Sequence, residues 1–240
     1  MAKSHPEHNR IYWVKDNIIA NDFPDIRRAL KEPDGLLAIG GDLSPERLIN
    51  AYARGIFPWN NEGQPVLWWS PDPRWILLPE NIKVSRSLDK ILKSGKFSIT
   101  FNRDFPAVIR MCAAPRKDEE STWITNSIIT NFNKLHQLGY AHSVESWVDE
   151  KLVGGLYGIA MGKIFFGESM FSKTSNASKV ALVTLARFLS ASGFKLIDCQ
   201  VYTRHLESLG AIPMPRNSWA QALRDYCNPN DKLVLPDVAK

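Results

Sequence analysis

Polar side chains interrupt two apolar segments in the second half of the sequence. In FKLIDCQV, Asp198 and Gln200 are two residues apart, which in a β-strand places both side chains on one face, with their roots about 7 Å apart. In KIFFGESMF, Glu168 follows Gly167 directly. Burying an ionised carboxylate without a partner is costly, so each acid is expected to have a polar partner, a shifted pKa or a ligand. A satisfied polar network in the core is the alternative for each acid alone, whereas two acids and an amide in one sheet favour a site.

No other set of residues has the spacing of a metal, covalent or nucleotide site. The histidines and the three cysteines lack metal-ligand spacing, so no metal is expected. Ser169, Ser172 and Cys199 lack a nucleophile elbow or an adjacent base, so covalent catalysis is not expected. Neither a dinucleotide fingerprint nor a phosphate-binding loop occurs, and no nucleotide cofactor is predicted.

A positively charged stretch is the second feature that could bind a ligand. The formal net charge is +5, and residues 83–117 hold nine Lys or Arg against two Asp. A helix is expected to begin at Ser85, with Arg86, Lys90 and Lys93 on one face. Such a face suits a polyanion, but an ordinary solvated basic face has the same composition, and charge alone does not separate the two.

Tryptophan and proline are interleaved between residues 57 and 79. Trp59, Trp68, Trp69 and Trp75 lie there among five prolines. Flexible linkers are rich in Gly and Ser and poor in large apolar groups, so we expect an ordered connector that buries its rings or stacks a ligand on them. Burial is the simpler explanation for any one ring.

Turn residues and periodicity predict the elements that position these groups. Residues 141–171 are expected to form an antiparallel meander, with turns at 149–150 and 161–163, that carries Glu168. Residues 194–201 are expected to form the strand that carries Asp198 and Gln200. Helices are predicted between Ser44 and Gly55, from Ser85, at 128–138, and between a cap at Ser175 or Asn176 and a stop at Gly193. The chain therefore belongs to the mixed α/β (α+β) class, with a small α/β unit first.

Length and composition limit the classes of protein. With 240 residues, 44% hydrophobic and 23% charged, the chain has the composition of a folded globular protein and can form a small domain and a larger one. No apolar run reaches about 18 residues, and the first residues lack the apolar core of a secretory signal. Three cysteines without a disulfide pattern fit a reducing compartment. A cytoplasmic protein without a membrane partner is expected.

Several long strings carry a resemblance to a known family. They span residues 34 to 215 and include DGLLAIGGDLSPERLINAYARGIFPWNNEGQPVLWWSPDPRWILLPE, SRSL, STWITNSI, YAHSVESW, LVGGLYGIAMGKIFFGESMFSKTSNASKVAL and KLIDCQV. The chain resembles the leucyl/phenylalanyl-tRNA-protein transferase family. The resemblance implies transfer of Leu or Phe from aminoacyl-tRNA to the N-terminal Arg or Lys of a protein, which creates an N-degron for degradation. An apolar pocket separates similar side chains by only about 1–3 kcal/mol, so Met is a further expected donor.

The resemblance also implies a domain organisation. A small N-terminal domain, residues 1–72, would be joined to a catalytic domain, residues 73–240. The second domain would have an acetyltransferase-like (GNAT-like) fold with a mixed, largely antiparallel sheet, and would use no cofactor, metal or acyl-CoA.

Individual residues match roles in that family. Asp198 and Gln200 match a catalytic pair in which the carboxylate acts through the amide on the attacking α-amine, and Glu168 matches an acid that contacts the substrate. Trp59 and Trp123 match aromatic residues that hold the terminal adenosine of the tRNA. The walls of the amino-acid pocket match Leu156, Phe165, Met170 and Ile197, and the basic patch for the acceptor stem matches Arg86, Lys90 and Lys93. Core packing is the alternative explanation for the four apolar residues.

Two other functions remain open from the sequence. An acyl-CoA-dependent N-acetyltransferase would fit the pattern of residues 141–201, but it needs a Gly-rich loop at the start of the long helix, and residues 172–179 contain no glycine. A non-catalytic RNA-binding protein would explain the basic helix and the tryptophans. It would leave Asp198, Gln200 and Glu168 without a role.

Overall fold

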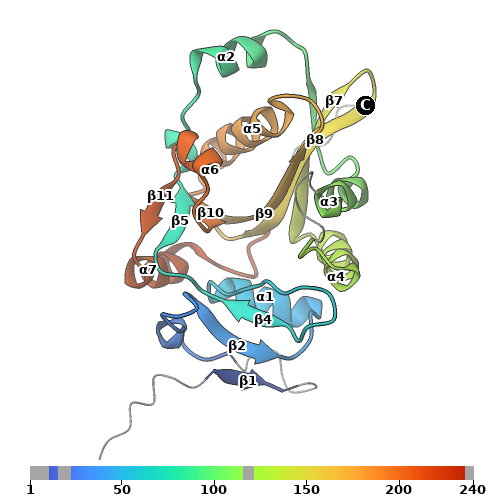
Figure 1. Cartoon of the computed structure of the whole chain (residues 1–240). Coiled ribbons are helices and arrows are strands. Elements are labelled where there is room, and N and C mark those ends of the chain that lie inside the picture. The colour runs from blue at the N-terminus through green and yellow to red at the C-terminus, as the bar shows by residue number, and fades with distance from the viewer. Residues whose placement is uncertain (1–10, 16–22, 116–121, 236–240) are drawn as a thin grey trace, which may run out of the picture.

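The computed structural model describes residues 11–15, 23–115 and 122–235, which are organised around two β-sheets (Figure 1). The smaller sheet has the strand order β1-β2-β4-β3. Its strands are β1 (Tyr12–Val14), β2 (Leu36–Gly40), β3 (Phe57–Pro58) and β4 (Leu67–Trp69). Strand β1 runs parallel to β2, and the other pairs are antiparallel. Helix α1 (Pro45–Ala53) and the 3-10 helix η2 (Ile26–Arg28) contribute to the core beside this sheet.

The larger sheet has seven strands in the order β11-β5-β10-β9-β8-β7-β6. The strands are β5 (Arg74–Leu77), β6 (Ser98–Phe101), β7 (Ala141–Val148), β8 (Lys151–Met161), β9 (Ile164–Ser172), β10 (Leu196–Gln200) and β11 (Ile212–Met214). All neighbouring strands pair antiparallel except β9 and β10, which are parallel. The predicted mixed, largely antiparallel sheet is confirmed.

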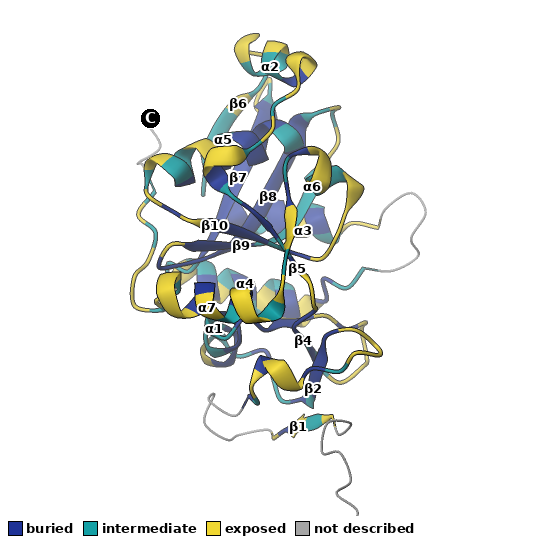
Figure 2. Cartoon of the chain, turned by 90° about the vertical axis from the view of Figure 1, so that its left-hand side faces the viewer, coloured by how far each residue is buried: buried dark blue, intermediate teal, exposed yellow. Residues whose placement is uncertain are grey.

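Helices cover both faces of the larger sheet. Helix α5 (Ala177–Ala191) packs on one face, and α2 (Arg86–Lys93) packs against α5 (Figure 1). The opposite face is covered by α3 (Phe105–Ala113), α4 (Asn126–Gln137), α7 (Arg216–Tyr226) and the N-terminal part of the chain. The 3-10 helix η3 (Pro79–Asn81) follows β5, and the short helix α6 (Arg204–Ser208) lies between β10 and β11 in the chain. The strands of the larger sheet are largely buried between these layers, while the outer faces of the helices are exposed (Figure 2).

One hydrophobic core joins the N-terminal part to the rest of the described chain. The ring of Tyr52 in α1 makes edge contacts with Phe166 in β9 and Phe132 in α4, at centroid distances of 5.5 and 6.4 Å. Trp219 of α7 contacts Phe166 in the same way at 6.2 Å. At Gly55 the backbone φ is +75°, and an added Cβ would lie 2.3 Å from Nε1 of Trp219. Only glycine therefore fits at this junction.

Most of the predicted elements are confirmed. The meander forms β7, β8 and β9, with both residues of the first turn at positive φ. Ser85 caps α2 by accepting a hydrogen bond from the Leu88 N–H at 3.2 Å. At the start of α5 the N-cap is Asn176, which has a left-handed φ of 69° and makes no capping side-chain bond.

Residues 57–79 are ordered, as predicted, and bury Trp68, but they do more than connect two parts of the chain. They form β3 and β4 of the smaller sheet and β5 of the larger sheet. Short strands interrupted by proline have no clear alternation, so their pairing depends on distant partners. Trp69 ends the smaller sheet and Arg74 begins the larger one. The division between residues 72 and 73 stays a prediction.

Candidate active site

The parallel strands β9 and β10 separate where the predicted site residues lie. Their pairing ends at Asp198 and Phe166. Beyond that point each strand contains a β-bulge, with Glu168 as the extra residue in β9 and Cys199 in β10. The bulges interrupt the regular alternation of side chains along the two strands. Beyond Asp198 and Phe166 the strands are no longer paired, which leaves an opening between them.

A pocket of about 520 Å³ occupies this opening. Its volume lies within the range of about 300–1,000 Å³ that is usual for small-molecule sites. The structure brings together in its walls all nine residues expected to act in catalysis or in binding adenosine and amino acid, namely Trp59, Trp123, Leu156, Phe165, Glu168, Met170, Ile197, Asp198 and Gln200. Sequence reasoning missed Leu182 and Leu185 of α5, which also line it. Their spacing on a buried helix is also that of ordinary core residues.

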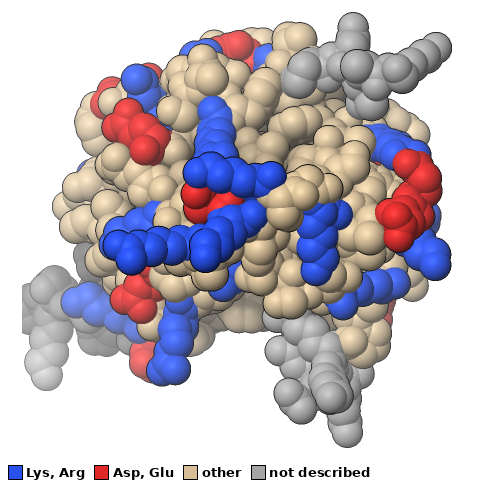
Figure 3. All heavy atoms as spheres, turned by 90° about the horizontal axis from the view of Figure 1, so that it is seen from above, with Lys and Arg blue, Asp and Glu red and all other residues tan. Residues whose placement is uncertain are grey.

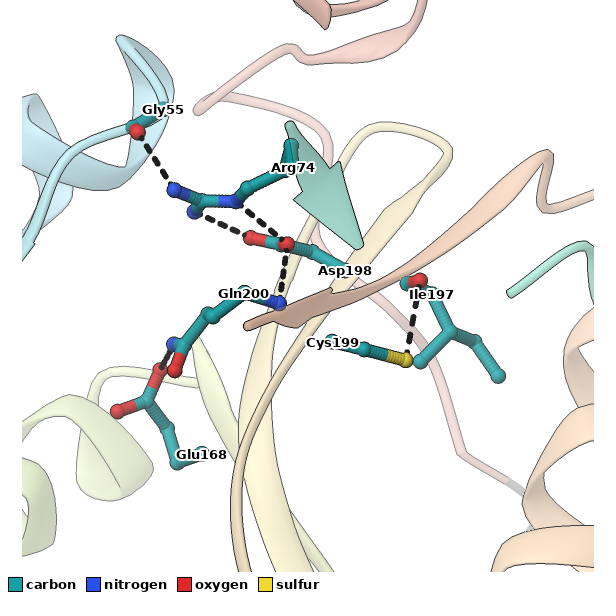
Figure 4. A network of polar contacts seen from close by, with 7 residues as sticks. All are labelled: Gly55, Arg74, Glu168, Ile197, Asp198, Cys199 and Gln200. Carbon is teal, nitrogen blue, oxygen red and sulfur yellow. Dashed lines mark hydrogen bonds and ion pairs between the residues drawn. The ribbon is translucent and has the colours of Figure 1, made fainter. Parts of the chain in front are cut away.

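Asp198 is fully buried and held by a fully buried arginine that sequence reasoning missed. Nε of Arg74 donates to Oδ1 of Asp198 at 2.7 Å, and Nη2 donates to Oδ2 at 2.6 Å (Figure 4). Such a bidentate pair fixes geometry as well as charge. Arg74 is the single Lys or Arg between Arg54 and Lys83. An isolated cation in an apolar strand, together with a buried acid that needs a partner, is the signal that could have found it.

Gln200 and Asp198 face different partners. The backbone N–H of Gln200 donates to Oδ1 of Asp198 at 2.9 Å, whereas its side-chain Nε2 donates to Oε1 of Glu168 at 2.8 Å (Figure 4). The bulge at Cys199 and a φ of 64° at Gln200 interrupt the regular strand geometry that was expected, although both side chains line one pocket as predicted. A chain of contacts thus runs from Arg74 through Asp198 and Gln200 to Glu168.

Glu168 is the acid whose charge the surroundings disfavour. Burial raises its pKa from 4.5 to about 8, and the charge of Asp198 adds to the increase. Tyr52 and Gln200 oppose the shift by stabilising the carboxylate. The Tyr52 hydroxyl is close enough to Glu168 to lower its pKa, but makes no hydrogen bond of good geometry to the described residues. A carboxyl group with this pKa can accept or release a proton near neutral pH.

The remaining polar groups of the pocket do not form a nucleophilic or metal site. Burial raises the pKa of the Cys199 thiol well above its ordinary value, and Cys199 packs against the core beside α5. Burial and the nearby Lys179 lower the pKa of His205, which lines the pocket. Within the described residues no group of three or more His, Cys, Asp or Glu could hold a metal ion.

Trp59 and Trp123 approach the pocket from different segments. Trp59 follows β3 and is 46% exposed, and Nε1 of Trp69 donates to its carbonyl oxygen at 2.8 Å. Trp123 is half-buried just before α4. Exposed aromatic rings in a pocket wall can stack on a planar ligand such as a nucleobase.

The basic side chains of α2 form a separate surface. Arg86, Lys90 and Lys93 do not line the pocket. From the side of α2, Figure 3 shows Lys and Arg side chains gathered with an acidic group among them. Nζ of Lys93 lies 2.6 Å from Asp89, which reduces the positive charge of this helix face. Arg116 and Lys117, the last two cations of the predicted basic stretch, lie outside the described residues.

Across the ranges that the structure describes, no helix has the length and apolar character needed to cross a bilayer.

Two family models match the chain over adjacent ranges. One, described as "Leucyl/phenylalanyl-tRNA protein transferase", matches residues 76–224, and the other, described as the N-terminal domain of the same family, matches residues 41–72. Proteins with that name are similar over most of their length. The protein of Nitrosospira multiformis is 57% identical over 218 residues, covering 91% of this chain and 93% of its own. The protein of Pseudomonas aeruginosa PAO1 is 58% identical over 205 residues, covering 85% and 91%.

Two solved structures illustrate a distant similarity in fold. A functionally unknown conserved protein from Staphylococcus epidermidis aligns with a TM-score of 0.40 at 11% identity, covering 60% of this chain and 57% of its own. A GCN5-related N-acetyltransferase from Kribbella flavida aligns with a TM-score of 0.39 at 9% identity, covering 68% and 58%.

Proposed function

The chain belongs to the leucyl/phenylalanyl-tRNA protein transferase family, whose members move an aminoacyl group from tRNA to a protein. On this basis we propose the substrates of this enzyme. The donors are Leu-tRNA and Phe-tRNA, with Met-tRNA as a weaker donor. The acceptor is the N-terminal Arg or Lys of a protein in the cytoplasm, which becomes an N-degron. The observation that carries the proposal is one pocket that combines an apolar wall, two tryptophans and the Gln200–Glu168 pair.

The apolar wall supports a Leu or Phe side chain as the transferred group. Leu156, Phe165 and Ile197 are almost completely buried, and Met170, Leu182 and Leu185 extend the same wall. A charged side chain would lose its hydration there without gaining a partner. One methylene group more or less changes binding by only about 1–3 kcal/mol, so several apolar amino acids are accepted.

Trp59 and Trp123 support binding of the adenosine that carries the amino acid. The aminoacyl ester is attached to the ribose of that nucleoside, so base and amino acid must enter one site together. The two rings line the same pocket as the apolar wall. Stacking on aromatic side chains contributes about 1–3 kcal/mol for each base.

The reaction needs a neutral amine and a place for its proton. The amine nitrogen forms the new C–N bond to the ester carbonyl carbon, the bond from that carbon to the ribose oxygen breaks, and the proton lost by nitrogen ends on that oxygen. In its ionised form Glu168 accepts the proton in transit, while Gln200 orients the carboxylate. Both carboxylate oxygens of Asp198 accept hydrogen bonds from Arg74, and Oδ1 also accepts one from the backbone N–H of Gln200. Asp198 therefore holds Gln200 in place. This assigns the proton-accepting role to Glu168 rather than Asp198.

Arg86, Lys90 and Lys93 are proposed to contact the phosphates of the tRNA acceptor stem. All three cations belong to one short helix, and Lys93 is 76% exposed. Cations on an exposed helix face bind a phosphate backbone without reading sequence.

One assay tests the proposed substrates. Labelled Phe-tRNA is incubated with a peptide that begins with Arg, with the same peptide acetylated at its N-terminus, and with a peptide that begins with Asp. Transfer to the first peptide only is expected. A parallel reaction with acetyl-CoA should leave the Arg peptide unchanged. Acetylation there, or tRNA binding without any transfer, would overturn the proposal in favour of an N-acetyltransferase or an RNA-binding protein.

A further inference from the structure

Arg74 is a fully buried cation whose contacts reach three parts of the molecule. Its guanidinium holds both oxygens of Asp198, and Nη1 donates to the carbonyl oxygen of Gly55 at 3.2 Å (Figure 4). Its central carbon lies 4.7 Å from the Phe57 ring centroid and 5.0 Å from that of Trp219. A buried charge persists only where it is paired and hydrogen-bonded. The guanidinium of Arg74 makes hydrogen bonds in its plane and contacts aromatic rings outside its plane, so its charge is compensated.

The partners of Arg74 belong to the two halves of the candidate site. Gly55 and Phe57 lie in the segment that continues directly to Trp59. Asp198 lies in β10 and binds the backbone N–H of Gln200. Phe57, Trp59, Asp198 and Gln200 all line the same pocket. One guanidinium therefore connects the segment with the exposed tryptophan to the strand with the amide.

The backbone next to Arg74 needs such support. Gln200 has a φ of 64°, a left-handed conformation that is unfavourable for residues other than glycine. Beyond Asp198 the parallel pairing of β10 with β9 has ended. The bond from Gln200 N–H to Oδ1 of Asp198 is thus a fixed point of this turn, and Arg74 in turn fixes the carboxylate.

We propose that Arg74 is a positioning residue that sets the distance between bound donor and bound acceptor. Through Gly55 and Phe57 it places the Trp59 segment, and through Asp198 it places Gln200 and Glu168. The inference rests on the proposed function, since it takes the Trp59 side as the adenosine side and the Glu168 side as the amine side. Arg74 does not line the pocket and need not touch a substrate. Small misplacements of reacting groups reduce the rate of the bound complex more than they reduce binding.

The first test separates positioning from a purely structural role. Arg74→Lys keeps the charge but cannot make the bidentate and stacked contacts. We expect kcat for transfer from Phe-tRNA to an Arg peptide to fall at least 10-fold, with KM for both substrates within 3-fold of wild type. The matched control is Arg47→Lys, since Arg47 is also a buried arginine paired with an acid but lies in α1 away from the pocket. It should lower the melting temperature while kcat stays within 2-fold.

The second test is a double-substitution cycle across the same ion pair. Asp198→Asn breaks the link from the other side, and the combined Arg74→Lys, Asp198→Asn protein should have a kcat within 3-fold of the slower single variant. Losses that multiply would show that the two residues act independently and would overturn the proposal, as would a folded Arg74→Lys protein with kcat within 2-fold of wild type. If Arg74→Lys does not fold, Asp198→Asn alone must show the same split between kcat and KM, and an effect on KM alone would overturn the proposal.

A binding measurement distinguishes failure of this inference from failure of the proposed function. The probe is phenylalanine joined to the 3′ position of adenosine by an amide, which resembles the donor but cannot react. Both wild type and Arg74→Lys should bind it within 3-fold of each other. If the probe does not bind wild type and wild type transfers nothing, the proposed function fails. If wild type transfers and the Arg74 variant binds the probe more than 10-fold more weakly, the residue serves donor binding and the positioning role fails.

Discussion

At the scale of single residues, the site depends on the different surroundings of two acids, Asp198, which is fully buried, and Glu168, which is half-buried. Asp198 is paired with Arg74, whereas Glu168 forms no ion pair with any described residue and accepts a hydrogen bond from Gln200. Different surroundings give two neighbouring acids different chemical roles. Glu168 is the acid that can exchange a proton near neutral pH, since its pKa is raised to about 8.

Glu168→Gln tests the proton-accepting role through the pH dependence of transfer. Below pH 8 the wild-type carboxyl is mostly protonated, and the acceptor amine, with an ordinary pKa of about 8, is mostly charged. A plot of log kcat/KM for the acceptor peptide against pH should therefore rise between pH 5.5 and 7 with a slope near 2 in wild type and near 1 in the variant. The variant should also lose about 10²–10⁴-fold in kcat at pH 8. Equal slopes would remove Glu168 from the proton transfer.

The same substitution has a separate effect on stability. Because the folded-state pKa of Glu168 is raised from 4.5 to about 8, the folded protein keeps a proton that the unfolded chain releases. The contribution of Glu168 to the free energy of unfolding is therefore complete below pH 4.5 and falls as the pH rises to 8. Glu168→Gln removes this loss. Relative to wild type, the melting temperature of the variant should increase from pH 5 to pH 8, measured in buffers of equal ionic strength. A difference that does not change with pH would contradict the raised pKa.

At the scale of elements, α2 allows a test of tRNA binding that is independent of the pocket. The logarithm of the tRNA-binding constant falls linearly with the logarithm of the salt concentration, and each cation that neutralises a phosphate contributes about 0.7–0.9 to the magnitude of that slope. Changing Arg86, Lys90 and Lys93 together to Gln should weaken tRNA binding and reduce that slope by about 2–3, measured by filter binding at several salt concentrations. The control replaces three exposed lysines that lie outside α2, Lys151, Lys163 and Lys195. An equal effect of both triple variants would show that α2 has no special part in binding.

Elements with local signals were predictable from the sequence, and those without were not. The meander has clear turns and α2 has a clear N-cap, so the extent of the meander and the start of α2 could be read directly. Strand β5 and the bulges at Glu168 and Cys199 depend on pairing with distant strands. Glu168, Asp198 and Gln200 stood out in the sequence pattern itself, and the family resemblance added the two tryptophans and the apolar wall of the pocket. Neither indicated the partners of Asp198 and Gln200. Arg74, 124 residues away from Asp198 in sequence, is the clearest example.

At the scale of the whole molecule, the two sheets are joined by packing rather than by a linker. Tyr52 contacts Phe132 and Phe166 across the junction, and Gly55 lies against Trp219. The pocket is lined by Trp59 from one side of this junction and by Glu168 from the other. Residues that must stay aligned for catalysis thus lie on two parts that share one core. The junction should therefore be rigid and should unfold together with both parts.

Calorimetry can test whether the two parts unfold together. We expect one transition with a ratio of calorimetric to van't Hoff enthalpy near 1, because separating the parts would expose Tyr52, Phe166 and Trp219, each fully buried. Tyr52→Ala should lower the free energy of unfolding by about 3–5 kcal/mol, the usual cost of removing a large buried ring, and should still give one transition. Hydrogen exchange should then accelerate in β2 and in β8 alike, because the cavity weakens a core that both sheets need. Two separate transitions, or faster exchange in β2 alone, would mean that the N-terminal part is an independent unit, and the position of Trp59 relative to Glu168 would then have to be set by tRNA binding instead of by the fold.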